Sequence, residues 1–504
     1  MTSEATPLQL RSTSLQYKVD VWRREEARKR DLTRGGIFLL LLCALSVFIM
    51  HVTEFLVDDE ESDSAGRHVQ TRNMAQDKLV NITSEVFCGL IPDDSGYIEL
   101  PNIDERFFYW FFKSRRQPDT DPLVLWLTRR PVSSSLQALL TENGPCQVLP
   151  DLSTRINPYS WTNESNVLWL DLPTSGSTYA DEDTAEISEM KVGENVYCFL
   201  QRFFAKHPEL AMRDLFITGE SYGGHYVPVV SHYVWKRSKE ITDIPKVINL
   251  KGISIGNSLF QAAIQMPHYL NMAINNSYNI ALVDAAELNT MKEALPECVS
   301  RLKQCPQNLT ACRAGEDFCM KELLNPMLMA DRNPFDIRLP YQNDDIDIKG
   351  DNMSYVSRYL NSLKIQTALN LDLKHSDALQ ECNLNRYNAS IKSANPAEPI
   401  DSYVADLLND DVRVLVYAGD ADLVSNWFGS EVWTLALKWK DRDGFNAANV
   451  TSFITKNGVN AGAVRSLKKL FTFLRVYSSG HFVVKDQPAV ALDILNRFLR
   501  DEDF

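Results

Sequence analysis

The stretch that decides the fold is Arg213-Asp-Leu-Phe-Ile-Thr-Gly-Glu-Ser-Tyr-Gly-Gly-His-Tyr-Val-Pro228. It places Gly219-x-Ser221-x-Gly223 between an apolar run at 215–218 and a segment of helical character at 225–239. Small glycines let the chain turn sharply, so that the serine hydroxyl projects above a sheet. The helix that follows directs its N-terminal dipole at developing negative charge. This strand-turn-helix arrangement predicts a nucleophile elbow with Ser221 as the nucleophile.

A nucleophilic serine needs a base, and an imidazole base needs a carboxylate that orients it. Downstream of Ser221, the apolar run 412–417 ends in a loop with Asp420 and Asp422, and the run 470–477 leads to His481. The order Ser, Asp, His, each after a later strand, is typical of α/β-hydrolases. The other histidines lie in the amino-terminal segments, beside the elbow helices or in a later insertion, so we predict His481 as the base. The spacing leaves both aspartates open as the orienting group.

The rest of the chain beyond residue 86 alternates short apolar runs with helical segments, which predicts an α/β fold with a largely parallel sheet. Predicted strands are 107–112, 123–127, 167–170, 215–218, 253–255, 412–417 and 470–477, and predicted helices include 186–206 and 225–239. The interval from about 260 to 400 breaks this alternation and is predicted to be an inserted cap. It carries Cys298, Cys305, Cys312 and Cys319 at intervals of seven. This spacing favours a disulfide-braced cap over a zinc site, which usually has closer Cys-x-x-Cys pairs.

Composition limits the classes of function. The 504 residues include 52 Lys and Arg against 66 Asp and Glu, a formal charge of −14. This balance excludes a generally basic nucleic-acid-binding protein, which needs clustered cations. With 44% hydrophobic and 23% charged residues, the chain has the composition of a globular protein. No metal-ligand cluster is apparent, and serine hydrolysis requires no cofactor.

The amino-terminal region predicts a membrane anchor. Residues 1–34 form a basic tail with eight Lys and Arg against five acidic residues, 35–57 are almost entirely apolar, and 58–85 form an acidic stalk. About 20 apolar residues cross a bilayer, and basic residues favour the cytoplasmic side. We therefore expect a single transmembrane helix and a type II membrane protein with residues 86–504 as a lumenal or extracellular domain. A cleaved signal peptide and a buried core helix are the alternatives.

Two further patterns favour a lumenal domain in the secretory or vacuolar/lysosomal system. All Asn-x-Ser/Thr sequons follow the apolar segment. They begin at Asn81, Asn163, Asn275, Asn308, Asn352, Asn388 and Asn449. Of the nine cysteines, Cys43 lies in the apolar segment, and the remaining eight are an even number that suits paired thiols in an oxidising compartment.

From about residue 86 to the carboxyl end, the chain resembles the serine carboxypeptidase family, and within it the carboxypeptidase Y type. The resemblance rests on Gly-Glu-Ser-Tyr-Gly-Gly-His-Tyr-Val-Pro at 219–228 and on Asn-Pro-Tyr-Ser-Trp at 157–161, Glu-Asn-Gly-Pro at 142–145, Ile-Gly-Asn at 255–257, Tyr-Ala-Gly-Asp-Ala-Asp at 417–422, Gly-His at 480–481 and Asp-Gln-Pro at 486–488. It implies a serine-type carboxypeptidase that removes carboxy-terminal residues from peptide or protein substrates through an acyl-enzyme. Ser221 would be the nucleophile, His481 the general base and acid, and Asp422, rather than Asp420, the orienting carboxylate.

The resemblance also implies the substrate-binding groups. The backbone N–H groups of Tyr222 and Arg130 would form the oxyanion hole. Glu220 and Glu142 would hold the terminal carboxylate of the substrate, because two adjacent carboxyls share a proton that one of them donates. Such a pair predicts peptidase activity at acidic pH.

One segment departs from the family, which has Trp-Leu-Asn-Gly-Gly-Pro-Gly where this chain has Trp-Leu-Thr-Arg-Arg-Pro-Val at 126–132. Thr128 replaces the carboxylate-binding asparagine, and Arg129 and Arg130 replace two glycines. Either Thr128 and Arg129 help to bind the carboxylate, or the pocket is obstructed and the protein is a weakly active or inactive glycoprotein with a binding or scaffold role. A third interpretation is that the protein is an acyltransferase that uses the same triad. The intact triad favours the peptidase.

Overall fold

A computed structural model describes residues 87–100, 106–127, 134–172, 189–241, 247–305, 308–341, 354–368 and 400–504. The chain divides into two compact units, Met1–Gln76 and Asp77–Phe504, and every described residue belongs to the second. The predicted basic tail, apolar segment 35–57 and stalk lie outside the described residues. Among the residues that are described, no helix combines the length and the apolar character that crossing a membrane requires.

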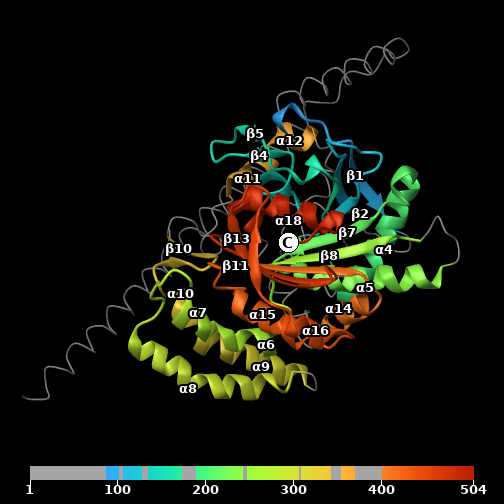
Figure 1. Ribbon diagram of the computed structural model, residues 1–504. Coiled ribbons are helices and arrows are strands. Elements are labelled where there is room, and N and C mark those ends of the chain that lie inside the picture. Colours follow the sequence, from blue (N-terminus) through green and yellow to red (C-terminus); the bar gives the residue numbers. More distant parts are fainter. Residues whose placement is uncertain are drawn as a thin grey trace, which may run out of the picture. The chain divides into compact units, whose positions relative to one another are not determined.

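A ten-stranded mixed sheet forms the centre of the described part of the domain (Figure 1). From edge to edge its strands are β1 (Asp94–Glu99), β2 (Arg106–Phe112), β6 (Asn166–Leu170), β3 (Leu123–Leu127), β7 (Leu215–Glu220), β8 (Leu250–Gly256), β11 (Arg413–Gly419), β14 (Phe471–Val476), β13 (Asn460–Leu467) and β12 (Thr451–Ile454). The run from β6 to β14 is parallel, and the two strands at each edge are antiparallel. The carboxyl ends of the parallel strands therefore meet at one edge, which is where α/β enzymes place their sites.

The central strands are buried on both faces, which explains their continuous apolar sequences. In β3, Leu123, Leu125 and Leu127 face one core, whereas Val124 and Trp126 face the other, and all five are fully buried. Burying each such side chain contributes about 1.5–3 kcal/mol. A charged residue at any of these positions would therefore disrupt the centre of the sheet.

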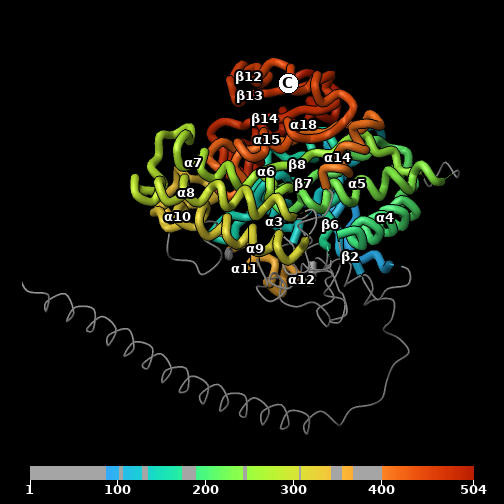
Figure 2. The backbone as a smooth tube through the Cα atoms, turned by 90° about the horizontal axis from the view of Figure 1, so that it is seen from below, coloured from blue at the N-terminus to red at the C-terminus, as the bar shows by residue number. Residues whose placement is uncertain are grey.

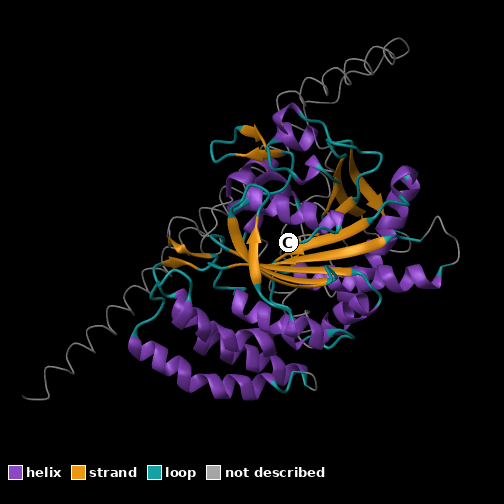
Figure 3. Cartoon of the chain, viewed as in Figure 1, coloured by secondary structure: helices purple, strands orange, loops and turns teal. Residues whose placement is uncertain are grey.

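Helices cover both faces of this sheet (Figure 3). One face packs against α4 (Glu189–Lys206), α5 (Gly223–Glu240), α14 (Ile400–Asn409), α15 (Trp427–Ala436) and α16 (Arg442–Ala447). The other packs against α3 (Leu136–Thr141), α11 (Ser354–Leu360), α12 (Leu363–Ala368), α17 (Val483–Asp486) and α18 (Pro488–Arg500). This three-layer arrangement, with an elbow after β7, is the α/β-hydrolase fold that the sequence predicts.

The segment between β8 and β11 contains a helical insertion that lies beside the sheet (Figure 2). The insertion consists of α6 (Ala262–Gln265), α7 (Tyr269–Asn275), α8 (Ala285–Leu302), α9 (Leu309–Cys319), α10 (Asn325–Leu328) and a hairpin of β9 (Arg332–Asn333) and β10 (Asp336–Pro340). The helices α11, α12 and α14 belong to the same segment of the chain but pack against the faces of the sheet. Disulfides Cys298–Cys319 and Cys305–Cys312 link α8, α9 and the turn between them. The predicted disulfide bracing is thus confirmed.

Short elements complete the described chain. They are the hairpin of β4 (Cys146–Val148) and β5 (Thr154–Ile156), the 3-10 turns Phe87–Gly89, Trp161–Asn163, Pro208–Leu210 and Met266–His268, and the π-helical turn Met320–Leu324. A third disulfide, Cys88–Cys146, joins the first 3-10 turn to β4. Cys198 departs from the expected pairing, because it remains a thiol that packs against the core from α4. Cys382 lies outside the described residues.

All seven predicted strands and both predicted helices are present, with ends that differ by a few residues. The prediction of a largely parallel sheet holds for the six central strands but not for the edges. The edge pairs β1–β2 and β12–β13 are antiparallel hairpins. In each pair the chain reverses direction between consecutive strands, whereas parallel neighbours require a crossover connection such as a helix. Most of the edge strands were missed because partial exposure leaves them without long apolar runs.

Candidate active site

The turn after β7 has the geometry of a nucleophile elbow. Ser221 adopts a left-handed backbone conformation with φ of +57° between β7 and α5, and its side chain is partly exposed. A non-glycine residue pays a conformational cost there, and such strain is found where a nucleophile must project. The Ser221 N–H donates to the Gly256 carbonyl over 2.9 Å, which ties the elbow to the end of β8. At Gly219 a Cβ would lie 3.0 Å from Val227 Cγ2, so a larger residue would force Val227 to shift.

Asp422 lies in the loop after β11 and is fully buried. Its Oδ2 atom is 2.8 Å from His481 Nδ1 and accepts a 2.8 Å hydrogen bond from Asn257 Nδ2. Its Oδ1 atom accepts hydrogen bonds from the backbone N–H groups of Val424, at 2.9 Å, and Ser425, at 3.2 Å. These donors fix the orientation of the carboxylate toward the imidazole.

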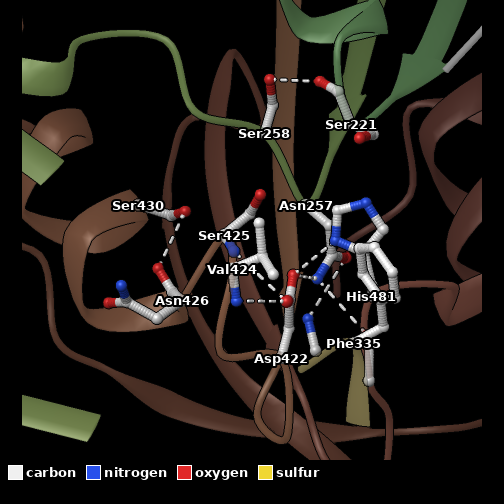
Figure 4. Close-up of polar contacts among 12 residues, drawn as sticks. Ser221, Asn257, Ser258, Phe335, Asp422, Val424, Ser425, Asn426, Ser430 and His481 are labelled. Carbon is white, nitrogen blue, oxygen red and sulfur yellow. Dashed lines mark hydrogen bonds and ion pairs between the residues drawn. The ribbon is translucent and has the colours of Figure 1, made fainter. Parts of the chain in front are cut away.

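His481 lies in the loop after β14 and is 2% exposed. Because a carboxylate only accepts hydrogen bonds, its contact with Asp422 places a proton on Nδ1 and leaves Nε2 as the basic nitrogen. In Figure 4 the imidazole lies between Asp422 and Ser221, with its second nitrogen on the side of the serine. The structure therefore brings Ser221, His481 and Asp422 together in the order that a serine hydrolase uses.

Asn257 has a structural role that the sequence did not reveal. Besides its bond to Asp422, its Oδ1 accepts from the Gly419 N–H at 3.3 Å, and its own N–H donates to the Tyr417 carbonyl at 2.9 Å. It thereby links the end of β8 to the end of β11. In the sequence, Asn257 stands out only because it closely follows the predicted strand 253–255, in the segment Ile-Gly-Asn at 255–257.

Asp420 is also buried, but its side-chain contacts are with residues other than His481. Its carboxylate accepts a hydrogen bond from the Tyr278 hydroxyl and lies 3.5 Å from Arg475. Burial and this bond raise the pKa of Tyr278 above its usual range. Asp420 therefore connects the end of β11 to the insertion, whereas Asp422 contacts His481.

Glu142 and Glu220 are both fully buried, after α3 and at the end of β7. Burial raises the pKa of the Tyr417 hydroxyl well above its usual range, and the charges of Glu220 and Glu142 raise it further. Both carboxyls therefore act on one tyrosine ring at the carboxyl end of β11. Thr128, Arg129 and Arg130 lie outside the described residues, so their place relative to the two glutamates is not described.

The comparisons with known proteins agree with this geometry. The family model described as serine carboxypeptidase matches residues 90–501. A protein named carboxypeptidase Y homolog A from Sclerotinia sclerotiorum is 35% identical over 410 residues, which are 81% of this chain and 72% of the relative. The chain belongs to the serine carboxypeptidase family. Carboxypeptidase Y of Candida albicans is 34% identical over 408 residues, covering 80% of this chain and 72% of the relative.

A solved structure agrees with the fold. The crystal structure of Kex1, a prohormone-processing carboxypeptidase from Saccharomyces cerevisiae, aligns with a TM-score of 0.70 at 24% identity. It covers 82% of this chain and 92% of its own. This likeness shows that the two chains share their fold.

Within this serine carboxypeptidase, Tyr222 is the N-cap residue of α5, so its backbone N–H lies at the start of the elbow helix. His207, His225 and His232 contact Asp94, Leu259 and Asp406, respectively. Among the described residues, no group of three or more His, Cys, Asp and Glu side chains is arranged to hold a metal ion.

The described sequons differ in exposure. Asn275, Asn308 and Asn449 are exposed. Asn163, in contrast, donates from Nδ2 to the Pro158 carbonyl at 2.8 Å and accepts from Arg115 at 2.9 Å. The sequons at Asn81, Asn352 and Asn388 lie outside the described residues.

Proposed function

We propose that this serine carboxypeptidase removes carboxy-terminal residues from peptides through an acyl-enzyme on Ser221. The observation that carries the proposal is the buried contact between His481 Nδ1 and Asp422 Oδ2, at 2.8 Å, beside a serine on a strained elbow. Asp422 holds the imidazole in the tautomer whose Nε2 accepts the serine proton. The Ser221 oxygen attacks the scissile carbonyl, His481 passes the proton to the leaving amino acid, and water then releases the acyl group by the reverse proton transfers.

The developing oxyanion would be bound by the backbone N–H groups of Tyr222 and Arg130. Two donors at this position typically supply about 10²–10³ in rate each. Because both donors are backbone groups, replacement of glycine by arginine retains the N–H while changing the backbone freedom of the loop. Restoring the family residues at Thr128, Arg129, Arg130 and Val132 tests this segment directly. Higher activity indicates an impaired pocket, and lower activity indicates that the arginines bind substrate.

Glu142 and Glu220 are proposed to recognise the terminal carboxylate of the substrate. Two buried carboxyls in one region resist simultaneous ionisation, so one retains a proton and donates it to the substrate. Activity should consequently be highest at acidic pH and fall as the shared proton is lost. Peptides with free and amidated carboxyl ends, compared at about pH 5, test this recognition. Equal cleavage of the two would refute it.

Covalent labelling with a fluorophosphonate tests the nucleophile without requiring a substrate. We expect labelling at Ser221 in the wild-type protein and its loss in His481→Ala, because the alanine variant has no base. Failure of correctly folded wild-type protein to react would refute the enzymatic proposal and favour the binding or scaffold alternative.

We further propose a type II membrane protein with residues 86–504 on the lumenal side. The basic tail, the apolar segment 35–57 and the acidic stalk support this orientation, and the disulfides suit an oxidising compartment. The full chain should remain in the membrane pellet after alkaline carbonate extraction. A protein found in the supernatant would favour a cleaved signal peptide instead.

A further inference from the structure

The side chain of the second elbow residue is held by a buried acid on a neighbouring helix. The Tyr222 hydroxyl donates to Glu189 Oε1 at 3.0 Å, and the same oxygen lies 3.2 Å from His225 Nδ1 as an ion pair. The rings of Tyr222 and His225 stack, with centroids 4.8 Å apart and an interplanar angle of 13°. Glu189, at the start of α4, is 7% exposed. One carboxylate oxygen thus contacts the side chains of both Tyr222 and His225.

The other nitrogen of the same histidine reaches the loop after β8. His225 Nε2 lies 2.7 Å from the Leu259 carbonyl. The adjacent Ser258 hydroxyl donates to the Ser221 carbonyl at 2.6 Å, a contact drawn in Figure 4. This approach needs Gly224, since a Cβ there would lie 1.8 Å from Ser258 Oγ. These polar contacts, together with the peptide bonds Ser221–Tyr222 and Ser258–Leu259, therefore form a closed ring of contacts that begins and ends at Ser221.

This ring favours a charged histidine. Nε2 of His225 contacts the Leu259 carbonyl, and Nδ1 lies at ion-pair distance from the Glu189 carboxylate, so both ring nitrogens face groups that favour a proton on them. A neutral imidazole has a single N–H and would turn a lone pair toward either Leu259 or Glu189. The ring of contacts is complete only in the imidazolium form.

The surrounding charges favour that form. Burial opposes the charge on His225, but the neighbouring Glu189 carboxylate and the bond to Leu259 outweigh it and raise the pKa of the imidazole. Glu316, on α9 of the insertion, acts on His225 from a third element. Burial raises the pKa of Glu316 to about 7, against the opposing effects of His225 and Arg313 and together with that of Asp317.

We propose that Glu189 and His225 are positioning residues that hold the Ser221–Tyr222 elbow in its reactive geometry. We further propose that activity is lost in alkaline solution because the His225 imidazole loses its proton and the ion pair with Glu189 is broken. The inference rests on the proposed function and extends it from the triad to its support. Because the folded state favours the protonated imidazole, its stabilising contribution is present at low pH and disappears as pH rises through the folded-state pKa. The elbow is then held less firmly while the triad residues stay unchanged.

The test is the pH dependence of fluorophosphonate labelling in the full chain. This probe has no carboxylate and therefore bypasses Glu142 and Glu220. In Glu189→Gln the amide oxygen still accepts hydrogen bonds but lacks the charge, so the alkaline limb should move to lower pH by about one to three units. The acid limb should not move. The matched control is Glu194→Gln, in the same helix, whose carboxylate contacts Lys191 at the surface.

The outcomes separate this inference from the proposed function. A purely structural role for Glu189 would lower the labelling rate equally at every pH, and that result would overturn the inference alone. If the wild-type protein is not labelled at any pH, the proposed function and the inference fail together. A shift in the alkaline limb of Glu189→Gln that is absent in Glu194→Gln supports the inference.

A second measurement does not depend on activity. NMR titration of ¹³C-labelled histidine, with the His225 signal assigned through His225→Gln, reports the protonation of this imidazole directly. We expect His225 to titrate above the usual histidine range in the wild type and lower in Glu189→Gln. Titration of His225 at the same pH in both proteins would contradict the proposed coupling even if Glu189→Gln folds poorly enough to reduce labelling.

Discussion

At the residue scale, partners rather than burial separate the two aspartates of the loop after β11. Both are almost completely buried, yet Asp422 accepts from His481, Asn257 and two backbone N–H groups, whereas Asp420 contacts Tyr278 and Arg475. Asp420 therefore contacts the insertion through Tyr278, whereas Asp422 orients the imidazole of His481. Substituting each in turn should affect different properties of the protein.

Asp422→Asn should lower kcat by about 10⁴-fold, because an amide N–H facing Nδ1 favours the wrong imidazole tautomer. Asp420→Asn should change kcat far less and instead lower the free energy of unfolding by about 1–3 kcal/mol, through its weakened contacts with the insertion. Steady-state kinetics of both variants measures kcat, and thermal unfolding measures their stability. A larger loss of kcat in Asp420→Asn would contradict this assignment.

The nucleophile and the base could be identified from sequence because each follows its strand directly. Ser221 has glycines on both sides, and His481 is the single histidine in the described chain at the end of a predicted parallel strand. The choice of Asp422 over Asp420 needed family resemblance, since spacing alone admits both. Asn257 and Glu189 were not assigned roles, because their partners come from strands and helices distant in sequence.

At the element scale, the β9–β10 hairpin of the insertion joins the two loops that carry the base and its orienting acid. The Phe335 carbonyl accepts from the His481 N–H at 2.7 Å, and the Pro334 carbonyl accepts from the Leu423 N–H at 3.1 Å. The N–H of Ile337 donates to the Ala421 carbonyl at 3.0 Å. The insertion therefore supports the triad through backbone contacts, which are independent of side-chain identity.

Gly480→Ala tests this support. Its Cβ would lie 2.2 Å from the Phe335 carbonyl oxygen, so the hairpin and the His481 loop must separate. We expect the labelling rate at Ser221 to fall by about 10²-fold, as for a displacement of about 1 Å at a catalytic group. Thermal unfolding should show destabilisation of about 1–3 kcal/mol from overpacking.

The control for this variant is Gly444→Ala in α16. A Cβ at Gly444 would lie 3.3 Å from the flexible end of Leu467, and alanine is favoured over glycine in a helix by about 1 kcal/mol. This variant should retain full labelling with equal or higher stability. If Gly480→Ala behaves like Gly444→Ala, the hairpin does not hold the His481 loop.

The main elements could be predicted from sequence wherever burial on both faces gives a continuous apolar run, as in β3 and β11. The hairpin could not, because β9 and β10 are short and partly exposed and show little alternation. Their pairing is fixed by contacts with loops more than 80 residues later in the chain. Local sequence patterns do not encode such long-range support.

At the scale of the whole molecule, the three disulfides within the described residues should contribute unequally to stability. Cys88–Cys146 closes a loop with a sequence separation of 58 residues, whereas Cys305–Cys312 has a separation of 7. Loop-closure entropy predicts about 4 kcal/mol for the first and about 2.5 kcal/mol for the second. Replacing both cysteines of each pair with serine should therefore lower the Tm more for Cys88–Cys146. Calorimetry measures the Tm of both variants, each of which keeps Cys298–Cys319 intact. An equal decrease in Tm for the two variants would contradict this prediction.

We predict that a glycan on Asn449 would protect the open edge of the sheet. Asn449 is exposed and lies two residues before β12, the last strand of the sheet. Val450, just before this strand, is 51% exposed, and Ile454, at its end, is 43% exposed. An unpaired apolar edge favours aggregation, and a bulky hydrophilic glycan beside it would block pairing with another chain.

Glycopeptide mass spectrometry of the protein from a eukaryotic secretory host should find glycans on Asn275, Asn308 and Asn449. Asn163 should be unmodified, because a glycan on its Nδ2 would disrupt the bond to Pro158. Asn449→Gln should aggregate faster on heating than Asn275→Gln, whose sequon lies at the end of α7 and away from any strand edge. Equal aggregation of these two variants would show that the glycan beside β12 does not protect the edge of the sheet.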